Sequence, residues 1–414
     1  MARIKKSNPV VAALKRVGLV RVILCSLVGL VGAGFAFILA ISGITRLGNP
    51  PFALTFFPSE GMALGAQADI LVTDKPKDPP AQVRSFALAA LRNQAINPRA
   101  LRVLGFYTEV HGDFANAEKL VLMAERLSRR ESLAQMWLIE ASARRNDTAQ
   151  TLVHYDAALR VRPDNALVLF PRLASAIEDA DIRAALKPYI AAKNGWGELF
   201  LADAIAKNAD GPSLAALMID SGGIADREAN RELQKSLLGR LVDNGYHQDA
   251  RRLYLSMDGA SAKRLSSTAF DFADRSGGHG PIGWQTIDDV DGGGAFTGQA
   301  GQNDITLEIF VSAASTRLVT RKLLFLPSGT YGFVVSLARL DSDPGGHLRW
   351  QIRCMQGKSG PLIWTVQGTE KTIRSSFAIP GNCPVQMIEL VASGGQGQAG
   401  IEATIASVKV MSLR

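Results

Sequence analysis

At 414 residues the chain is long enough for more than one domain, and its 47% hydrophobic content allows ordinary buried cores. The net charge is +8, but six basic residues and no acidic residue fall within residues 1–21, which leaves only +2 on the rest of the chain. This near-balance excludes the basic face that a nucleic-acid-binding domain needs, so we expect no nucleic-acid partner.

An uncharged stretch, Val22 to Ile44, follows the basic N-terminus. As a helix it is roughly 34 Å long, enough to cross a hydrocarbon core of about 30 Å. The alternative, a cleavable signal peptide, has an apolar region of only about 7–15 residues and a small-residue cleavage site. Because basic residues favour the cytosolic side, we expect a cytosolic tail (1–21), a transmembrane helix (22–44) and all later residues across the membrane. In a bacterium this is a single-pass inner-membrane protein with its bulk in the periplasm.

Six prolines fall within residues 45–81. Proline stops helices and central strands, so this segment is predicted to be a partly extended linker that lifts the rest of the protein off the membrane. Its apolar part, Phe52 to Pro58, can rest at the membrane interface or against the next domain.

Residues 82–258 have helical spacing and an internal repeat. In LGFYTEVHGDFANAEKLVLMAE, which starts at Leu104, small residues recur where two helices would cross. A second copy lies one period further along, and a later copy, LLGRLVDNGYHQDARRLYLSM, repeats the spacing. The small residues predicted at helix crossings are Gly112, Ala117, Ala124, Ala158, Gly245 and Ala250.

A period of about 34 residues, with small residues at the crossings and a closing proline, here Pro163, resembles the tetratricopeptide repeat. The resemblance implies an α-solenoid of stacked helix pairs, with a concave surface for protein partners. A generic, irregular helical bundle is the alternative.

Residues 259–282 are predicted to be a glycine-rich linker, and residues 283–414 an antiparallel β-sandwich or jelly roll of about eight strands. In HLRWQIRC, for example, alternate residues share one apolar face. The succession of LLFLPSGTYGFVVSL, a tryptophan-bearing strand and GIEATIASVKVMSL resembles the jelly rolls of carbohydrate-binding modules. The predicted fold class is therefore α+β and multidomain, with one transmembrane helix, a tetratricopeptide-like solenoid and a β-sandwich.

Cys354 and Cys383 are the only cysteines outside the span, and both fall in the β domain. In an oxidising compartment such a pair is expected to form a disulfide, and closing a loop of about 30 residues would stabilise the domain by roughly 3–4 kcal/mol. Neither cysteine has a redox spacing such as C-x-x-C.

Aromatic residues of the β domain are the candidates for glycan binding, because sugars stack their C–H faces on exposed rings. The candidates are Trp284, Tyr331 and Trp364, and the alternative for each is a place in the core. The acidic turn Asp288–Asp291 is either a structural calcium loop or a polar turn. No nucleotide-binding, nucleophile-elbow or histidine metal motif occurs, so we expect no catalytic residue, metal or cofactor.

The sequence therefore predicts a non-catalytic, membrane-anchored scaffold with protein partners on its repeats. A resemblance to membrane-anchored tetratricopeptide proteins of bacterial exopolysaccharide systems implies a role in assembling or exporting a cell-surface polysaccharide, with a glycan-binding C-terminal module. A protein-only adaptor in a secretion, pilus or cell-division complex is the main alternative, and an enzyme with an unrecognised site in the β domain is another.

Overall fold

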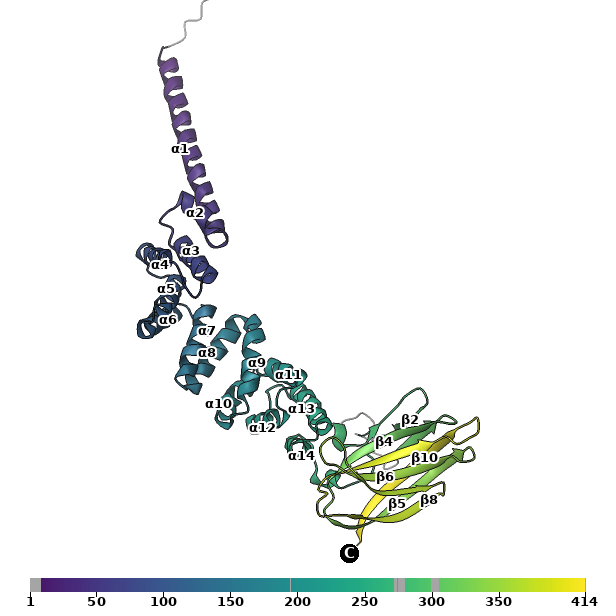
Figure 1. Ribbon diagram of the computed structural model, residues 1–414. Coiled ribbons are helices and arrows are strands. Elements are labelled where there is room, and N and C mark those ends of the chain that lie inside the picture. The colour runs from purple at the N-terminus through teal and green to yellow at the C-terminus, as the bar shows by residue number, and fades with distance from the viewer. Residues whose placement is uncertain (1–8, 194, 272–273, 275–279, 299–304, 414) are drawn as a thin grey trace, which may run out of the picture. The chain divides into compact units, whose positions relative to one another are not determined.

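The chain begins with a long apolar helix, α1 (Pro9–Gly48), in the computed structural model, which describes residues 9–193, 195–271, 274, 280–298 and 305–413 (Figure 1). Within α1, the 28 residues from Arg21 to Gly48 have a mean hydropathy of 2.6, and none of their most apolar stretch is buried. This helix is long and apolar enough to cross a membrane. Of the predicted cytosolic tail, residues 1–8 lie outside the described residues.

The expected linker at 45–81 is instead mostly helical: α2 (Pro50–Phe56) and α3 (Gly61–Asp74) occupy it. Its prolines lie outside the helix interiors: Pro50 and Pro51 open α2, where the missing N–H costs nothing, and the other four lie in the connections between helices. The prediction of an extended linker was wrong because proline stops a helix only in its interior, and a helix can form between prolines that lie in its first turn or in the adjoining loops.

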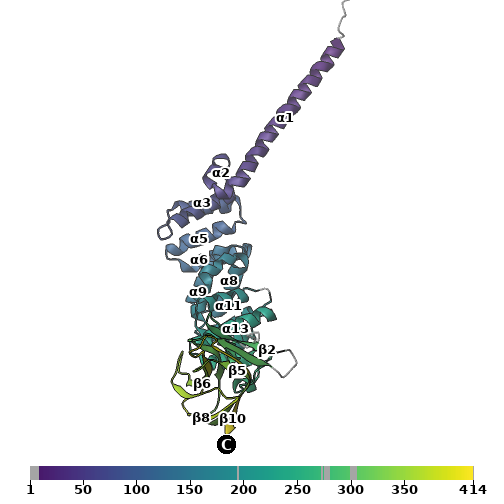
Figure 2. The same ribbon diagram turned by 90° about the vertical axis from the view of Figure 1, so that its right-hand side faces the viewer.

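The chain divides into two compact units, Met1–Asn165 and Ala166–Arg414. In the first unit, helices follow one another in pairs (Figures 1 and 2). After α3 they are α4 (Gln82–Asn93), α5 (Pro98–Val110), α6 (Phe114–Leu127), α7 (Ser132–Arg144) and α8 (Thr148–Val161), followed by a 3-10 turn, Pro163–Asn165.

The bounds of α7 and α8 are those of α5 and α6 moved along the chain by one period of the predicted repeat, and α4 ends one period before α6. Ala90, Ala124 and Ala158 occupy equivalent places and are each 0% exposed. These facts describe repeated helix pairs. The assignment to the tetratricopeptide family and the solenoid remain predictions.

The close contact between α5 and α6 is made by Gly105. A Cβ there would lie 2.7 Å from Val121 Cγ2 and 3.2 Å from the carbonyl oxygen of Ala117. Gly112, predicted at the crossing, lies instead in the turn after α5, with φ +86° and open space around it. The prediction that Gly112 lies at the helix crossing was therefore wrong. A glycine occurs there because the turn requires a left-handed backbone conformation.

Gly245 was also predicted at a helix crossing, and this prediction was wrong. It lies in the turn between α13 and α14 with φ +83°, and the backbone there approaches Gly357 of the β domain, not a neighbouring helix. Ala117 and Ala250 are on helices and fully buried.

A buried guanidinium ties three helices of the first unit together. Arg102 on α5 is 1% exposed and lies 2.8 Å from both Asp69 of α3 and Glu131, the residue that precedes α7. A buried cation without these partners would be strongly destabilising.

The second unit starts with six helices and ends in the β domain. The helices are α9 (Ala166–Ala176), α10 (Ala180–Ile190), α11 (Gly197–Ala206), α12 (Gly211–Ser221), α13 (Arg227–Asp243) and α14 (His247–Ser256).

The β domain is a sandwich of two five-stranded antiparallel sheets (Figure 1). Sheet A has the order β1 (Gln285–Thr286), β4 (Thr316–Leu324), β9 (Gln386–Ser393), β6 (His347–Cys354), β7 (Leu362–Gly368). Sheet B has the order β2 (Gly292–Thr297), β3 (Thr306–Val311), β10 (Ile401–Leu413), β5 (Gly329–Ser342), β8 (Thr372–Ile379).

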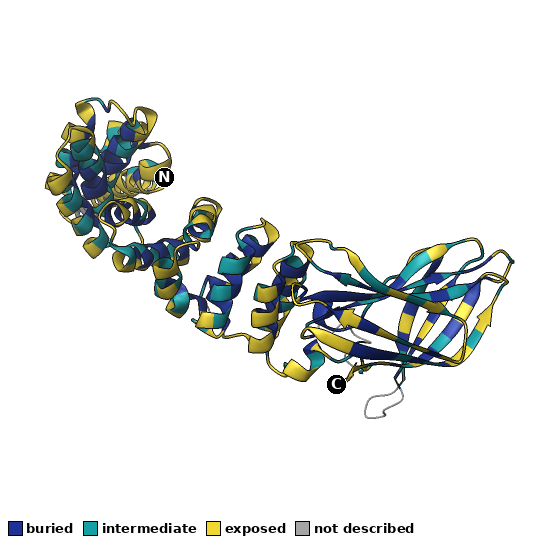
Figure 3. Cartoon of the chain, turned by 60° about the horizontal axis from the view of Figure 1, so that its bottom comes forward, coloured by how far each residue is buried: buried dark blue, intermediate teal, exposed yellow. Residues whose placement is uncertain are grey.

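Alternating side chains of both sheets fill one core, which the buried residues in Figure 3 trace along the strands. Within this core, Trp350 contacts both Trp284 and Phe333 edge to face. The antiparallel sandwich agrees with the sequence prediction, with ten strands among the described residues in place of about eight.

The predicted linker 259–282 is not free where it is described. Short 3-10 turns form at Ala262–Leu265 and Gly280–Ile282, while residues 272–273 and 275–279 lie outside the described residues. The Thr268 hydroxyl donates to the carbonyl of Val408 and accepts from the N–H of Val410. This segment is therefore fastened to β10 of the sandwich.

Candidate functional site

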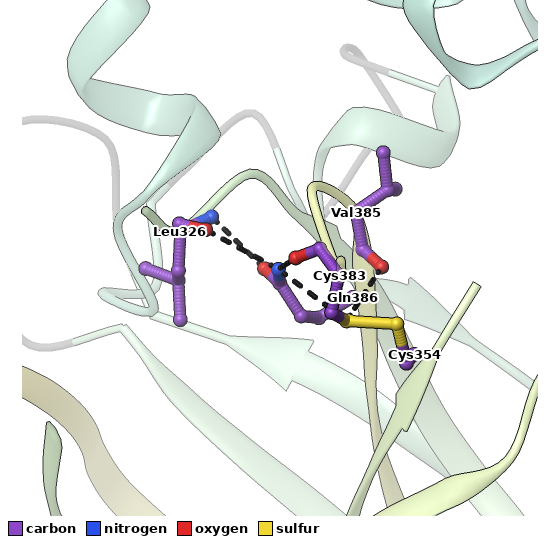
Figure 4. Close-up of a disulfide and its surroundings, with 5 residues drawn as sticks. All are labelled: Leu326, Cys354, Cys383, Val385 and Gln386. Atoms are coloured by element: carbon purple, nitrogen blue, oxygen red, sulfur yellow. Dashed lines mark hydrogen bonds between the residues drawn. A yellow bond between two sulfur atoms is a disulfide. The ribbon is translucent and has the colours of Figure 1, made fainter. Parts of the chain in front are cut away.

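The predicted disulfide is present. Cys354 at the end of β6 is bonded to Cys383 in the loop before β9, and both are buried (Figure 4). Beside them, the buried Gln386 side chain accepts from the N–H of Leu326 and donates to the carbonyl of Cys383. The bond and the amide together fix this loop to the end of sheet A.

Two of the three predicted stacking rings belong to the core. Trp284 is 1% exposed, and its indole N–H donates to the carbonyl of Thr268. Tyr331 is 7% exposed and stacks on Phe377, and its hydroxyl donates to Pro327. Because both rings are buried among neighbouring residues, neither is free to stack on a sugar, and these two predictions were wrong.

Trp364, the third predicted ring, is partly buried at the edge where β7 of sheet A meets β8 of sheet B. Its ring centroid lies 4.8 Å from Phe333 and 5.2 Å from Phe377, and its indole N–H donates to the Ser375 hydroxyl. Trp364 thus closes the open edge of the core and does not form an open platform.

A groove of about 520 Å³ lies on the outer face of sheet B. Phe310 of β3 is 44% exposed there, and it pairs with Glu402 of β10 on one side and with Gly293 of β2 on the other. One row further along the sheet, Glu308 lies between Ala295 and Thr404. The strands thus place one open aromatic ring beside two exposed carboxylates: that of Glu402 lies across from it on β10, and that of Glu308 two residues away on β3.

Polar groups at the rim of the groove are held by neighbours. The Arg339 guanidinium on β5 pairs with Asp341 at 2.6 Å and approaches Glu402 at 3.6 Å. The Thr297 hydroxyl donates to Glu308. All these groups are exposed or half-exposed, so their unused donors and acceptors are open to a ligand.

The acidic turn Asp288–Asp291 forms one end of the groove. Asp288 accepts from the N–H of Gly294, and its carboxylate occupies the space that a side chain at Gly293 would fill. Asp289 and Asp291 both pair with Arg317. Backbone hydrogen bonding from Asp291, followed by Arg317, lowers the pKa of the Asp289 carboxyl. Within the described part of the chain, no three His, Cys, Asp or Glu side chains are placed to hold a metal.

Phe310 was not among the sequence predictions, although a signal for it was present. In DITLEIFVSA the residues Ile305, Leu307 and Ile309 face the core, so Phe310 is a large aromatic in the polar register of its strand. An aromatic in the exposed register is more informative than a tryptophan, which is usually buried.

One buried cation lies at the end of the sandwich. Lys322 is 1% exposed, its ammonium lies 5.9 Å from the Trp284 ring centroid, and Asp274 is the opposite charge that affects it most. Burial lowers the pKa of Lys322 from 10.5 to about 8, and burial raises the pKa of Asp274. Because the ammonium is closed off from solvent, we assign it to the core and not to a reactive site.

The helices of the first unit carry a second, mainly apolar pocket of about 440 Å³. Phe114 at the start of α6 is 55% exposed, and the Arg144 guanidinium lies 5.7 Å from its ring centroid and 5.9 Å from that of Trp137. Arg144 is itself held by Glu109 at 3.1 Å. Arg145 also lines the pocket and pairs with Glu118. The pocket therefore offers aromatic faces and two guanidinium groups to a partner.

No protein-family model and no curated protein matches the sequence. Solved structures that match weakly, over the C-terminal β domain, are carbohydrate-binding modules. A structure of TmCBM61 in complex with beta-1,4-galactotriose has 12% identity and a TM-score of 0.22, and the match covers 31% of this chain and 88% of that one. A structure described as "CBM4 structure and function" has 15% identity and a TM-score of 0.21, with 36% and 95% covered.

Proposed function

We propose that this protein is a non-catalytic, membrane-anchored scaffold whose β domain binds a glycan in the groove on sheet B. The observation that carries the proposal is Phe310, an open ring beside the carboxylates of Glu308 and Glu402 on a solvent face. A ring stacks on the C–H face of a sugar, and flanking carboxylates accept hydrogen bonds from its hydroxyls. Convergent polar groups around an apolar floor are typical of a ligand site.

The charge of the groove indicates which class of glycan it could bind. Among the described residues that line it, four carry carboxylates and one, Arg339, carries a guanidinium; the carboxylates are those of Asp288, Asp289, Glu308 and Glu402. Like charges repel across such a face, so a polymer of acidic sugars should bind poorly. We propose a neutral or amino-sugar polymer.

The remaining parts of the proposal concern location and partners. The apolar helix and the basic residues before it support an anchor with the β domain across the membrane, and the disulfide is consistent with an oxidising compartment such as the periplasm. The pocket beside Phe114 supports a protein partner for the helices. In this proposal the chain joins a cell-surface polysaccharide to the machinery that assembles or exports it.

The test is binding of the full-length protein in detergent to neutral, amino-sugar and acidic polysaccharides by calorimetry. Phe310→Ala should weaken binding about fivefold, since a stacked ring contributes about 1 kcal/mol. Leu362→Ala is the matched control, because Leu362 is 46% exposed on sheet A while Phe310 is 44% exposed on sheet B. Equal losses in both variants, or no binding to any glycan, would reject the groove.

A protein-only adaptor is the second candidate, favoured by the exposed Phe114 and its pocket. In that case the groove on sheet B would also contact protein. Phe114→Ala should then abolish co-purification of the partner from membranes, while no polysaccharide accompanies the wild-type protein.

A further inference from the structure

The chain remains almost free of charged residues beyond the end of α1, the helix proposed to span the membrane. Between Arg21 and Glu60 the only charged residue is Arg46. This stretch includes all of α2, whose exposed side chains include two aromatic rings: Phe52 is 42% exposed and Phe56 is 45% exposed. Their rings contact each other edge to face, with centroids 5.2 Å apart.

Helix α2 begins immediately after α1 and lies against its end (Figures 1 and 2). Asn49 joins the two: its N–H donates to the carbonyl of Thr45, and its side chain accepts from the N–H of Phe52. Pro50 and Ala53 are buried, while Phe52 and Phe56 are exposed. The helix thus has one covered side and one open, aromatic side.

The length of α1 indicates how deep in the membrane α2 would lie. The 28 residues from Arg21 to Gly48 are about 42 Å long at 1.5 Å per residue, against about 30 Å for the hydrocarbon core and about 40–45 Å for the bilayer with its headgroups. The last two turns of α1 therefore reach the headgroup layer. Ser42, about 9 Å before Gly48 along the helix, is only 4% exposed because α1 packs there against the helices that follow.

We propose that α2 lies in the headgroup layer of the membrane, with Phe52 and Phe56 inserted among the lipids. Aromatic and aliphatic side chains on one side of a short helix are what interfacial segments use to bind lipid. On the last turns of α1, Ile44 and Leu47 are also apolar and exposed, and Arg46 is an exposed cation at the same level, which lipid phosphates would attract. The inference rests on the membrane anchor of the proposed function, and it goes beyond that function because it assigns α2 a contact with the lipid headgroups.

The experiment uses the full-length chain in phospholipid vesicles, with Cys25→Ser to remove the free thiol. Single cysteines, Phe52→Cys or Phe56→Cys, carry an environment-sensitive dye. Leu30→Cys in the span and Ile96→Cys in the loop after α4 are the controls, at 77% and 70% exposure. Substitutions at such open positions should leave folding unchanged.

We expect dyes at 52 and 56 to emit at shorter wavelength than the dye at 96, to resist quenching by iodide and to be quenched by brominated lipids. Quenching by iodide at 52 and 56 with protection at 30 would overturn the proposal and leave the anchor standing. Loss of protection at 30 would overturn the anchor as well. Protection at 52 and 56 without quenching by brominated lipids would mean that protein, such as a second copy, covers α2, which also contradicts the proposal.

Discussion

Replacing Gly105 with alanine tests the corrected contact between α5 and α6. An unhindered glycine-to-alanine change inside a helix should stabilise it by about 1 kcal/mol. Here the new Cβ would lie 2.7 Å from Val121 Cγ2, and a helical valine holds one rotamer, so the methyl cannot move aside. Forcing the helices apart costs about 1–3 kcal/mol, so the expected net loss is about 1 kcal/mol.

The sign of the effect should reverse when the obstructing methyl is removed. In a Val121→Ala background the 3.2 Å contact with the Ala117 carbonyl remains, which small shifts can relieve. Gly105→Ala should then stabilise the pair by up to about 1 kcal/mol. The expected coupling energy between the two positions is therefore about 2 kcal/mol, as for side chains in direct contact.

Amide hydrogen exchange in the full-length protein measures the local stability of α5 and α6, and therefore the effect of each substitution on it. A loss of about 1 kcal/mol speeds exchange roughly fivefold. Gly112→Ala is the control: it also destabilises, because of its φ of +86°, but nothing lies within 4 Å, so Val121→Ala should not change its effect. If Gly105→Ala slows exchange in both backgrounds, α5 and α6 do not meet at Gly105 and the reasoning fails.

Three further predictions concern the buried groups. Replacing Cys354 and Cys383 with serine together should lower the stability of the β domain by roughly 3–4 kcal/mol in thermal unfolding followed by near-ultraviolet circular dichroism, and an unchanged midpoint would contradict this. The pKa of Lys322 is about 8 in the folded chain against 10.5 for an unperturbed lysine, so the unfolded chain binds one more proton between these values. Stability should thus rise with pH across this window by up to about 3 kcal/mol, and Lys322→Met should remove the rise. Arg102→Met removes the buried cation from Glu131 and leaves Asp69 only the more distant Arg99, at 3.7 Å, so it should cost about 3 kcal/mol, seen as faster amide exchange in α5; exchange at the wild-type rate would show that the ion pairs add nothing.

Sequence periodicity located the helices better than it located their contacts. The repeat spacing is compatible with a crossing at either Gly105 or Gly112, because both lie within the same unit of the pattern. Only the folded structure shows which glycine would collide with a neighbour and which merely allows a turn. The prediction of a linker from the prolines of residues 45–81 was wrong for a similar reason, because the sequence does not show whether a proline lies in the first turn of a helix or in its interior.

The disulfide could be predicted because few thiols were available and both fell in one small domain. The groove on sheet B could not be predicted, because which side chains lie together on the outer face of a sheet depends on how the strands pair. Tryptophan was predicted to bind a sugar because its ring is large, yet large rings also fill cores: Trp284 and Trp350 contact each other in the core of the sandwich. The exposed ring, Phe310, is recognised only from the register of its strand.

The two faces of the sandwich are not equivalent, and this difference bears on how binding would work. The outer face of sheet A lies beside the end of α13: Val242 and Asp243 line one pocket with Met387 and Glu389 of β9, and Met387 is only 6% exposed. The outer face of sheet B keeps Phe310 and, further along, Met411 open, at 44% and 49% exposure. A polymer can therefore lie across sheet B without displacing the helices that adjoin sheet A. Because the groove is formed by strands that pair along their length, it is already assembled before a ligand arrives, and binding should not require a change in the helical part of the chain.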